Sequence, residues 1–214
     1  VKLNMGNPYG LGTGTTTNPV ELWADYIYLD TDERRRFAQV SHEYLIEQLQ
    51  FTGREALDSK HKLNFNHPVK ELVWVTEVAS GRNALNWCNY TDDADAITAA
   101  PNDGKYATWA AKLDSSADTI KNPTKSAKLT LNGNDRFAKR DGSYFNLIQP
   151  FQHHENVPSN IGINVYSFAL KPEEHQPSGT LNMSRIDTAT LDLEYTDNCS
   201  VGTDTVSVYA VNYN

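Results

Sequence analysis

The chain has 214 residues and a formal net charge of −8, from 27 Asp and Glu against 19 Lys and Arg. This acidic balance, without a basic arm, disfavours nucleic-acid binding through phosphate contacts. No apolar run reaches the roughly 18 residues that a transmembrane helix needs, whereas 39% hydrophobic residues suffice for a core. The chain begins at Val1 without a signal peptide and ends within a strand-like pattern, so we expect part of a longer polypeptide.

The N-terminal segment predicts a loop followed by one strand. Residues 1–19 are rich in Gly, Thr and Asn and read as a long loop. Residues 20–30 (VELWADYIYLD) carry apolar side chains on both strand faces, which is typical of a strand inside a two-layer structure. No partner strand lies nearby in the sequence. The pattern therefore predicts that most of its sheet lies upstream of residue 1.

Residues 30–50 change to a helical period and predict a linker between two β regions. Asp30 is suited to cap a helix, and Glu33 lies three residues later, as in a capping box. Ser41 allows a break and a second helical start. We interpret Arg34–Arg36 as a solvated helix face paired with nearby acids, in preference to a phosphate-binding patch. The helical apolar stripe comprises Phe37, Val40, Tyr44, Leu45 and Leu49.

From residue 53 the pattern is that of an all-β domain with one polar insertion. PVKELVWVTEV places Leu72, Trp74 and Thr76 on one strand face. Residues 79–126 are rich in polar and turn residues, and long loops of this kind commonly carry recognition. Tyr106, Trp109 and Leu113 could anchor a short helix within this insertion.

The remaining segments predict further strands. Asn132-Gly133 is a tight-turn signal, residues 143–158 (SYFNLIQPFQHHENVP) read as a strand, and residues 189–195 and 205–213 alternate cleanly. Roughly eight strands with little helix favour a β-sandwich or jelly roll.

A stiff corner joins two of these predicted strands. Tyr166, Phe168 and Leu170 alternate as in a strand with one buried face, and Leu181 and Met183 resume the alternation. Between them, Pro172 and Pro177 fix the backbone and remove two donors, so the sheet ladder cannot continue. This corner carries Glu173, Glu174 and His175 at its tip.

No pattern supports catalysis or a cofactor. His153 and His154 are adjacent, and neighbours on a strand point to opposite faces, so they are poorly placed to share a metal. Glu173-Glu174 and the pair Asp192 and Glu194 give no reason for a raised pKa. There is no Gly-rich phosphate loop or nucleophile elbow. We therefore expect no enzyme activity, no metal and no cofactor.

Three other features allow limited predictions. Asn89, Asn182 and Asn198 begin Asn-x-Ser/Thr motifs, of which Asn89, in the polar insertion, is the candidate for glycosylation. Arg185 and Asp187 predict a local ion pair or a bond to loop backbone, with a subunit contact as the alternative. Two cysteines, Cys88 and Cys199, favour reduced thiols over a bridge.

Several long motifs resemble one known family. They are ELWADYIYLDTDERRRFAQVSHEYLIEQLQF, LNFNHPVKELVWV, LTLNGNDRF and YSFALKPEEHQPSGTLNMSRID. Together they closely resemble the major capsid protein of the nucleocytoplasmic large DNA viruses, of the iridovirus and phycodnavirus kind. The matches run in order from about residue 20 to residue 213, while residues 1–19 and 80–126 carry little of the resemblance.

The resemblance implies part of a double jelly-roll protein. Residues 1–30 would be the C-terminal loop and last strand of the first jelly roll, 31–52 a helical linker, and 53–214 the second jelly roll with an irregular insertion at about 80–126. Proteins of this family form homotrimers, which make pseudo-hexameric capsomers that tile an icosahedral shell over an internal membrane. The implied partners are therefore the chain itself, neighbouring capsomers and minor capsid or cement proteins. The implied location is the virion, with assembly in the host cytoplasm.

The resemblance also gives the proline corner a structural interpretation. Pro172, Glu173, Glu174, His175, Pro177, Arg185 and Asp187 would form a structural corner or a subunit contact. Two other hypotheses remain. A stand-alone carbohydrate-binding jelly roll would use the aromatic residues Trp87, Tyr90, Tyr106 and Trp109 as a platform. A metal-dependent enzyme of the cupin type would need a stoichiometric metal.

Overall fold

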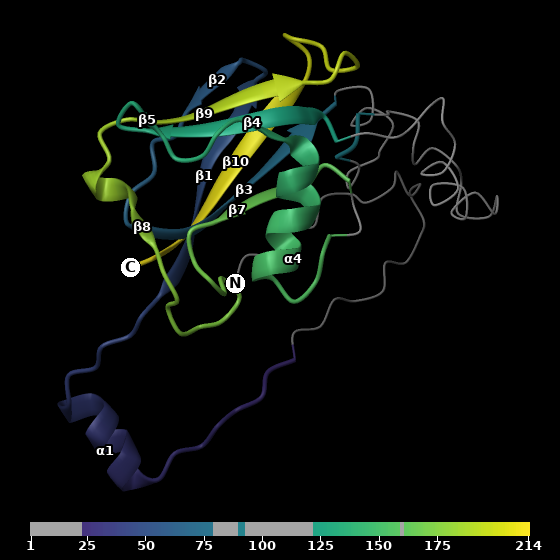
Figure 1. Ribbon diagram of the computed structural model, residues 1–214. Helices are drawn as coiled ribbons and strands as arrows, with labels where there is room; N and C mark the ends of the chain where they lie inside the picture. Colours follow the sequence, from purple (N-terminus) through teal and green to yellow (C-terminus); the bar gives the residue numbers. More distant parts are fainter. Residues whose placement is uncertain (1–22, 79–89, 93–121, 159–160) are drawn as a thin grey trace, which may run out of the picture. The chain divides into compact units, whose positions relative to one another are not determined.

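A computed structural model describes residues 23–78, 90–92, 122–158 and 161–214 (Figure 1). The chain divides into two units, Val1–Tyr44 and Leu45–Asn214. In the first unit, α1 spans Thr31–Gln39, and the carboxylate of Asp30 accepts a hydrogen bond from the N–H of Thr31 at 2.7 Å, so the predicted cap is confirmed. Residues 23–30 contain no strand. Their assignment to a preceding jelly roll therefore stays a prediction.

The helical prediction for residues 30–50 is wrong beyond Gln39. The chain leaves the helix at Val40, and the ring of His42 stacks on Phe37 with 5.3 Å between centroids. From Glu47 the chain is a strand. Leu45 and Leu49 are four residues apart, and this spacing is compatible with one face of a helix and with one face of a strand. The apolar pattern therefore did not distinguish the two.

The second unit is a sandwich of two antiparallel sheets. In its described part, sheet A has the order β1-β10-β3-β7, with β8 beside β3, and sheet B has the order β2-β9-β4-β5, with β6 beside β4. The strands are β1 (Glu47–Ala56), β2 (Lys60–Lys62), β3 (Pro68–Glu77), β4 (Thr124–Leu131), β5 (Asn134–Asp135), β6 (Arg140–Asp141), β7 (Asn164–Ser167), β8 (Leu181–Asn182), β9 (Ala189–Tyr195) and β10 (Thr205–Tyr213). The chain passes from one sheet to the other between β1, β2, β3 and β4, which is jelly-roll topology and confirms the predicted fold class.

The core lies between the two sheets and follows the predicted alternation. Leu72, Trp74 and Thr76 on β3 are fully buried, and they lie beside the inner side chains of β10 and face those of β4 and β9. The ring of Trp74 packs against Phe145 with 5.1 Å between centroids. Aromatic residues of this size supply much of the apolar burial in a small sandwich.

A bulge bends the edge strand β1. Two residues of β1, Thr52 and Gly53, stand opposite the single residue Val208 of β10. Gly53 has a φ of 93°, which residues with a side chain rarely adopt. The hydroxyl of Thr52 accepts a hydrogen bond from the N–H of Val208 at 3.2 Å. The apolar face of β1 is therefore interrupted after Phe51.

The tight turn predicted at Asn132-Gly133 is confirmed. Both residues have positive φ, 50° and 79°, as a two-residue hairpin loop of the favoured type requires. The amide oxygen of Asn132 also accepts the N–H groups of Asp187 and Thr188, at 2.9 and 3.0 Å. The hairpin between β4 and β5 therefore holds the chain just before β9.

The strand predicted over residues 143–158 is wrong, because this segment is helical. The π-helix η1 (Tyr144–Ile148) continues into α4 (Gln149–His153). Its buried side chains are Phe145, Asn146, Gln149 and Pro150, a spacing that fits one helix face. The buried amides are bonded: Asn146 donates to the carbonyl of Ile163 at 2.9 Å, and Gln149 accepts the N–H of Ser167 at 3.1 Å.

Three smaller boundaries also differ from prediction. The strand β7 ends at Ser167, and Leu170 is exposed rather than buried. A 3-10 helix, η2 (Met183–Arg185), replaces the predicted continuation of alternation through Met183. Because β4 starts at Thr124, the end of the predicted insertion belongs to a strand. Within the described residues, no helix combines the length and the apolar character needed to cross a membrane.

Candidate contact surfaces

The proline corner is closed at its base by one serine. The hydroxyl of Ser178 accepts the N–H of Lys171 at 2.9 Å and donates to the Lys171 carbonyl at 3.1 Å. Pro172 is buried at one end of the loop and Pro177 is exposed at the other. Gly179 has a φ of 140°, and a Cβ there would stand 3.0 Å from the carbonyl oxygen of Phe168. These contacts hold the two arms of the corner together.

The charged tip of the corner contacts two other elements. The carboxylate of Glu173 accepts the N–H of Glu155 at 2.8 Å, just beyond the end of α4. Lys171 and Glu174 form an exposed pair at 2.9 Å, and the ring of His175 lies 4.0 Å from Glu47 on β1. The corner therefore lies beside the end of α4 and the start of β1 (Figure 1).

The predicted ion pair between Arg185 and Asp187 is not formed. Among the salt bridges of the described residues, neither side chain takes part. The two residues do not share a strand, because η2 ends at Arg185 and the chain then turns toward Asn132. Instead, the backbone N–H of Asp187 donates a hydrogen bond to the side chain of Asn132 in the hairpin loop.

A buried ionic group that sequence reasoning missed lies beside the corner. Lys70 is only 3% exposed, and its ammonium group lies 2.9 Å from Glu47 and 5.6 Å from the ring centre of Tyr213. Glu71 accepts a hydrogen bond from His154 at 2.8 Å. This bond to Glu71 raises the pKa of His154, and burial opposes the shift. The available signal was the pair Lys70-Glu71 inside an otherwise apolar strand.

The two adjacent histidines serve different contacts. The ring of His153 bonds the carbonyl of Leu170 at 3.0 Å, whereas His154 turns toward Glu71. They diverge because the helix ends between them, and not because they alternate on a strand. The described part of the chain contains no group of three or more His, Cys, Asp or Glu that could hold a metal.

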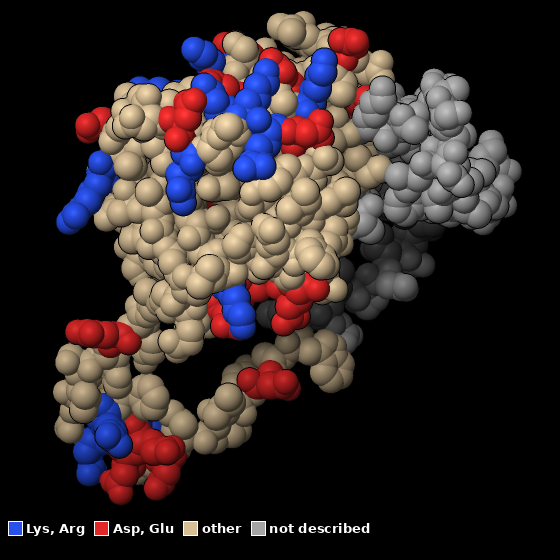
Figure 2. Space-filling view, viewed as in Figure 1, with Lys and Arg blue, Asp and Glu red and all other residues tan. Residues whose placement is uncertain are grey.

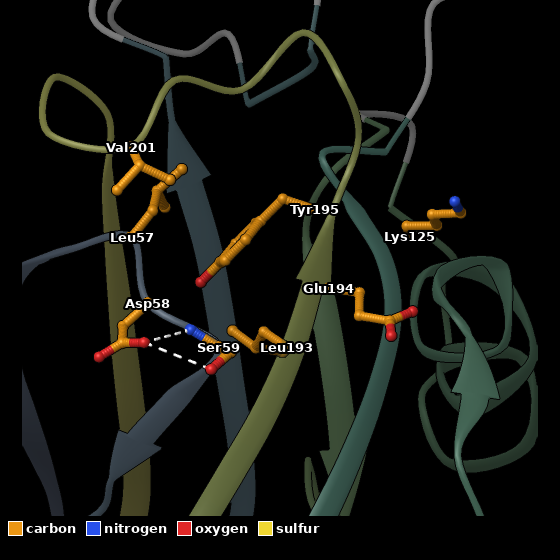
Figure 3. Close-up of a pocket in the computed structure, with 8 residues that line it drawn as sticks. All are labelled: Leu57, Asp58, Ser59, Lys125, Leu193, Glu194, Tyr195 and Val201. Carbon is orange, nitrogen blue, oxygen red and sulfur yellow. Dashed lines mark hydrogen bonds between the residues drawn. The ribbon is translucent and has the colours of Figure 1, made fainter.

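A hollow of about 500 Å³ lies at one end of sheet B (Figure 3). In Figure 3, Leu57 and Val201 lie close together at its upper side, and the carboxylate of Asp58 accepts the N–H of Ser59 at 2.6 Å. The hydroxyl of Tyr195, which lines the hollow, is hydrogen-bonded to the Nε2 of His61 at 2.9 Å. The Nδ1 of the same buried ring bonds Glu55 at 3.0 Å.

Glu55, His61 and Tyr195 are hydrogen-bonded in series, in the acid–histidine–hydroxyl order of a catalytic proton relay. The Tyr195 hydroxyl, however, is not activated as a nucleophile. Burial raises the pKa of the Tyr195 phenol well above its usual range, so the phenol stays protonated at neutral pH. A protonated phenol is a donor and not a nucleophile. These hydrogen bonds therefore connect Tyr195 at the end of β9 to the segment around β2.

Two apolar surfaces lie exposed on the second unit. The β1 strip consists of Leu45, Ile46, Leu49 and Phe51, and Leu49 is 63% exposed. Phe51 stacks on Tyr209 of β10 at 4.7 Å, so the strip has a rigid aromatic end. The α4 patch consists of Leu147, Ile148, Phe151 and Leu170, of which Phe151 is 79% exposed. Figure 2 shows an almost uncharged surface between the charged group at the end of α4 and the charges over sheet B.

The predicted sites in the insertion lie outside the described residues. These are the glycosylation candidate Asn89, the short helix at Tyr106, Trp109 and Leu113, and three of the four platform aromatics, Trp87, Tyr106 and Trp109. Cys88 also lies outside them. Cys199 is a half-buried free thiol, and burial raises its pKa.

Comparisons with known proteins agree with one another. A family described as the large eukaryotic DNA virus major capsid protein matches residues 33–214. The chain is 52% identical to the major capsid protein of Pyramimonas orientalis virus over 94% of this chain and 47% of that protein. It is 42% identical to the major capsid protein of Paramecium bursaria Chlorella virus 1, over 94% of this chain and 52% of that protein.

Solved structures show the same likeness. A quasi-atomic model of the PBCV-1 virus capsid matches with a TM-score of 0.65 and 39% identity, over 88% of this chain and 52% of that one. The Faustovirus major capsid protein matches with a TM-score of 0.53 at 15% identity, which is evidence of the fold alone. The chain spans about half the length of these curated relatives.

Proposed function

Because the chain belongs to the major capsid protein family of large eukaryotic DNA viruses, we propose that it is the second jelly roll of a capsid subunit. In this proposal the intact subunit forms a homotrimer, and the trimer is a pseudo-hexameric capsomer of an icosahedral shell. Its role is structural and not enzymatic. The family membership carries the proposal.

The exposed apolar surfaces support self-association. Contiguous apolar surface is uncommon on monomers, and obligate homo-oligomeric interfaces are more apolar than the rest of a protein's surface. The α4 patch suits such an interface, because it combines exposed large side chains with an almost uncharged surface on the side toward sheet B (Figure 2). We assign this patch to the contact between subunits of the trimer.

The remaining partners follow from the same proposal. The shell would sit in the virion, overlie an internal membrane and be joined by minor capsid or cement proteins, after assembly in the host cytoplasm. The acidic net charge of −8 fits a subunit that does not grip the genome. Three of the four platform aromatics of the carbohydrate-binding alternative lie outside the described residues, so this alternative stays a prediction.

The mass of the intact protein in dilute solution tests this proposal. Mass photometry at nanomolar concentration should give a single species of three times the subunit mass. An interface of obligate size stays closed at that dilution. A folded monomer that persists at high concentration would contradict the proposed function.

A further inference from the structure

The outer face of sheet B carries charges in register across its strands. Asp192 on β9 stands between Lys60 of β2 and Lys128 of β4, which forms a row of alternating sign. Glu194 stands opposite Ser126, whose hydroxyl donates to it at 2.7 Å. Figure 2 shows Lys, Arg, Asp and Glu gathered over β2, β4, β5 and β9. We call this surface the charged face.

The carboxylates of the charged face are partnered within the chain. Lys128 lies 3.1 Å from Asp135 and 3.5 Å from Asp192, and Lys139 pairs with Glu194. Asp141 accepts the hydroxyl and the N–H of Ser143, at 2.7 and 2.9 Å. These contacts lower the pKa of Asp135, Glu194 and Asp141, so all three stay ionised at neutral pH.

Several cations of the face have no such partner. Among the described residues, Lys60, Lys62, Lys125 and Arg136 form no salt bridge. The segments 58–62, 122–141 and 189–195, which build the face, hold seven Lys and Arg against five Asp and Glu. These segments of sheet B therefore have a surplus of two positive charges, although the whole chain has a net charge of −8, which leaves −10 on the rest.

The face is also hollowed and lacks one donor. A cavity of about 520 Å³ is lined by Lys60, Lys128, Lys139, Asp192 and Glu194, among others. Within the described residues, one carboxylate oxygen of Asp192 is buried and has no hydrogen-bond partner. A buried acceptor without a donor costs stability, about 1–3 kcal/mol for a neutral group and more for a charged one.

The opposite edge of the unit has the complementary composition. The tip of the proline corner carries Glu173 and Glu174, and Glu155 lies beside them at the end of α4. All three residues are exposed, and Lys171 is the one exposed cation that pairs there. Figure 2 shows this smaller charged group separated from the charged face by an almost uncharged surface.

We propose that the charged face of sheet B binds the acidic proline corner of a second copy of this chain. The proposal rests on the proposed function and names a contact between trimers, beyond the apolar contact within a trimer. Two different patches meet in this contact, so it is heterologous and propagates from one copy to the next instead of closing on a pair.

Such a contact is reversible and sensitive to salt. Exposed charges interact over a Debye length of roughly 10 Å at 0.1 M ionic strength, and this length shrinks to about 3 Å at 1 M. Complementary charges mainly set the rate of encounter and the partner's orientation. We therefore expect association between trimers to weaken at least tenfold when the salt concentration rises from about 0.05 to about 0.5 M.

Charge exchange between the two surfaces tests the proposal. The first variant of the intact protein carries Lys60→Glu with Lys62→Glu, and the second carries Glu173→Lys with Glu174→Lys. Each should form trimers by mass photometry, yet lose association between trimers by about tenfold or more in sedimentation velocity at low salt. The fourfold variant combines both exchanges, restores opposite charges and should recover the association.

The design separates this contact from a general effect of net charge. The first variant shifts the formal charge by −4 and the second by +4, so a net-charge effect would move them in opposite directions, whereas the proposal predicts loss in both. The variant Lys60→Arg with Lys62→Arg keeps the charge and should associate normally. If association between trimers does not recover in the fourfold variant, the proposal is overturned. It is also overturned if wild-type trimers bind phosphatidylserine vesicles but do not bind one another. Absence of trimers would instead refute the proposed function.

Discussion

At the scale of single residues, one histidine couples the corner region to pH. His154 is bonded to Glu71 and lies near Glu173, Lys70 and Glu155. Because Glu71 stabilises the charged imidazole, the pKa of His154 is raised in the folded protein. A raised pKa contributes stability that is fully present below the unfolded value of about 6.5 and is lost as pH rises through the folded value.

The His154→Gln variant should therefore lose part of this pH dependence. Wild-type protein should become less stable relative to the variant as pH rises from about 6 to about 8, a window that begins near the unfolded pKa. Urea denaturation at several pH values measures the difference. His153→Gln is the matched control, because its ring meets a carbonyl and no carboxylate. A constant difference across this window would show that the Glu71 contact does not stabilise the imidazolium.

A second residue, Asn132, joins two parts of the sandwich by itself. It adopts positive φ in the hairpin, and its amide oxygen accepts two N–H groups ahead of β9. Asn132→Ala removes both bonds and places a less tolerant residue at positive φ, so we expect a loss of about 2–3 kcal/mol in the free energy of unfolding. Urea denaturation checks this. Asn134→Ala, in the same hairpin, should cost less than about 1 kcal/mol because its side chain makes one long bond.

At the scale of elements, the proline corner acts through its shape. The variant Pro172→Gly with Pro177→Gly gives the loop more freedom in the unfolded and the folded chain. Pro172 is buried but lies outside the main hydrophobic core, so we expect trimer or higher assembly to fail at a temperature below the unfolding midpoint. Light scattering and circular dichroism on the same sample separate the two events. If assembly and unfolding stay coincident with wild type, the corner is only a connector.

Elements with a two-residue period and the helix α1 were predicted well, whereas η1 and α4 were not. The strands around Trp74, Leu191 and Val208 have one buried face, so their alternation is legible in the sequence. The segment at Phe145 buries asparagine and glutamine on the same face as phenylalanine, which hides its helical period. The ionic group at Lys70 escaped prediction because its partners come from three segments far apart in sequence.

At the scale of the whole molecule, the uncharged surface around α4 predicts where subunits meet. Phe151→Asp places a charge at the most exposed position of the α4 patch, and a charge buried at an apolar interface without a partner costs several kcal/mol. We expect the trimer to dissociate in mass photometry at nanomolar concentration, with the folded state intact. Val201→Asp is the matched control, because Val201 is equally exposed on a loop outside both apolar surfaces. Equal dissociation of both variants would contradict the assignment of the patch.

The bulge at Thr52 and Gly53 has a consequence for chains that have not yet found their partners. An open sheet edge with leucine and phenylalanine beside it is a template for stray strands, and repeated addition would grow a fibre. Because the bulge shifts the ladder after Phe51, an added strand would keep step for only a few residues and then lose its bonds. An unassembled subunit therefore keeps exposed apolar surface for specific assembly, while its irregular strand edge limits the repeated strand addition that would form a fibre.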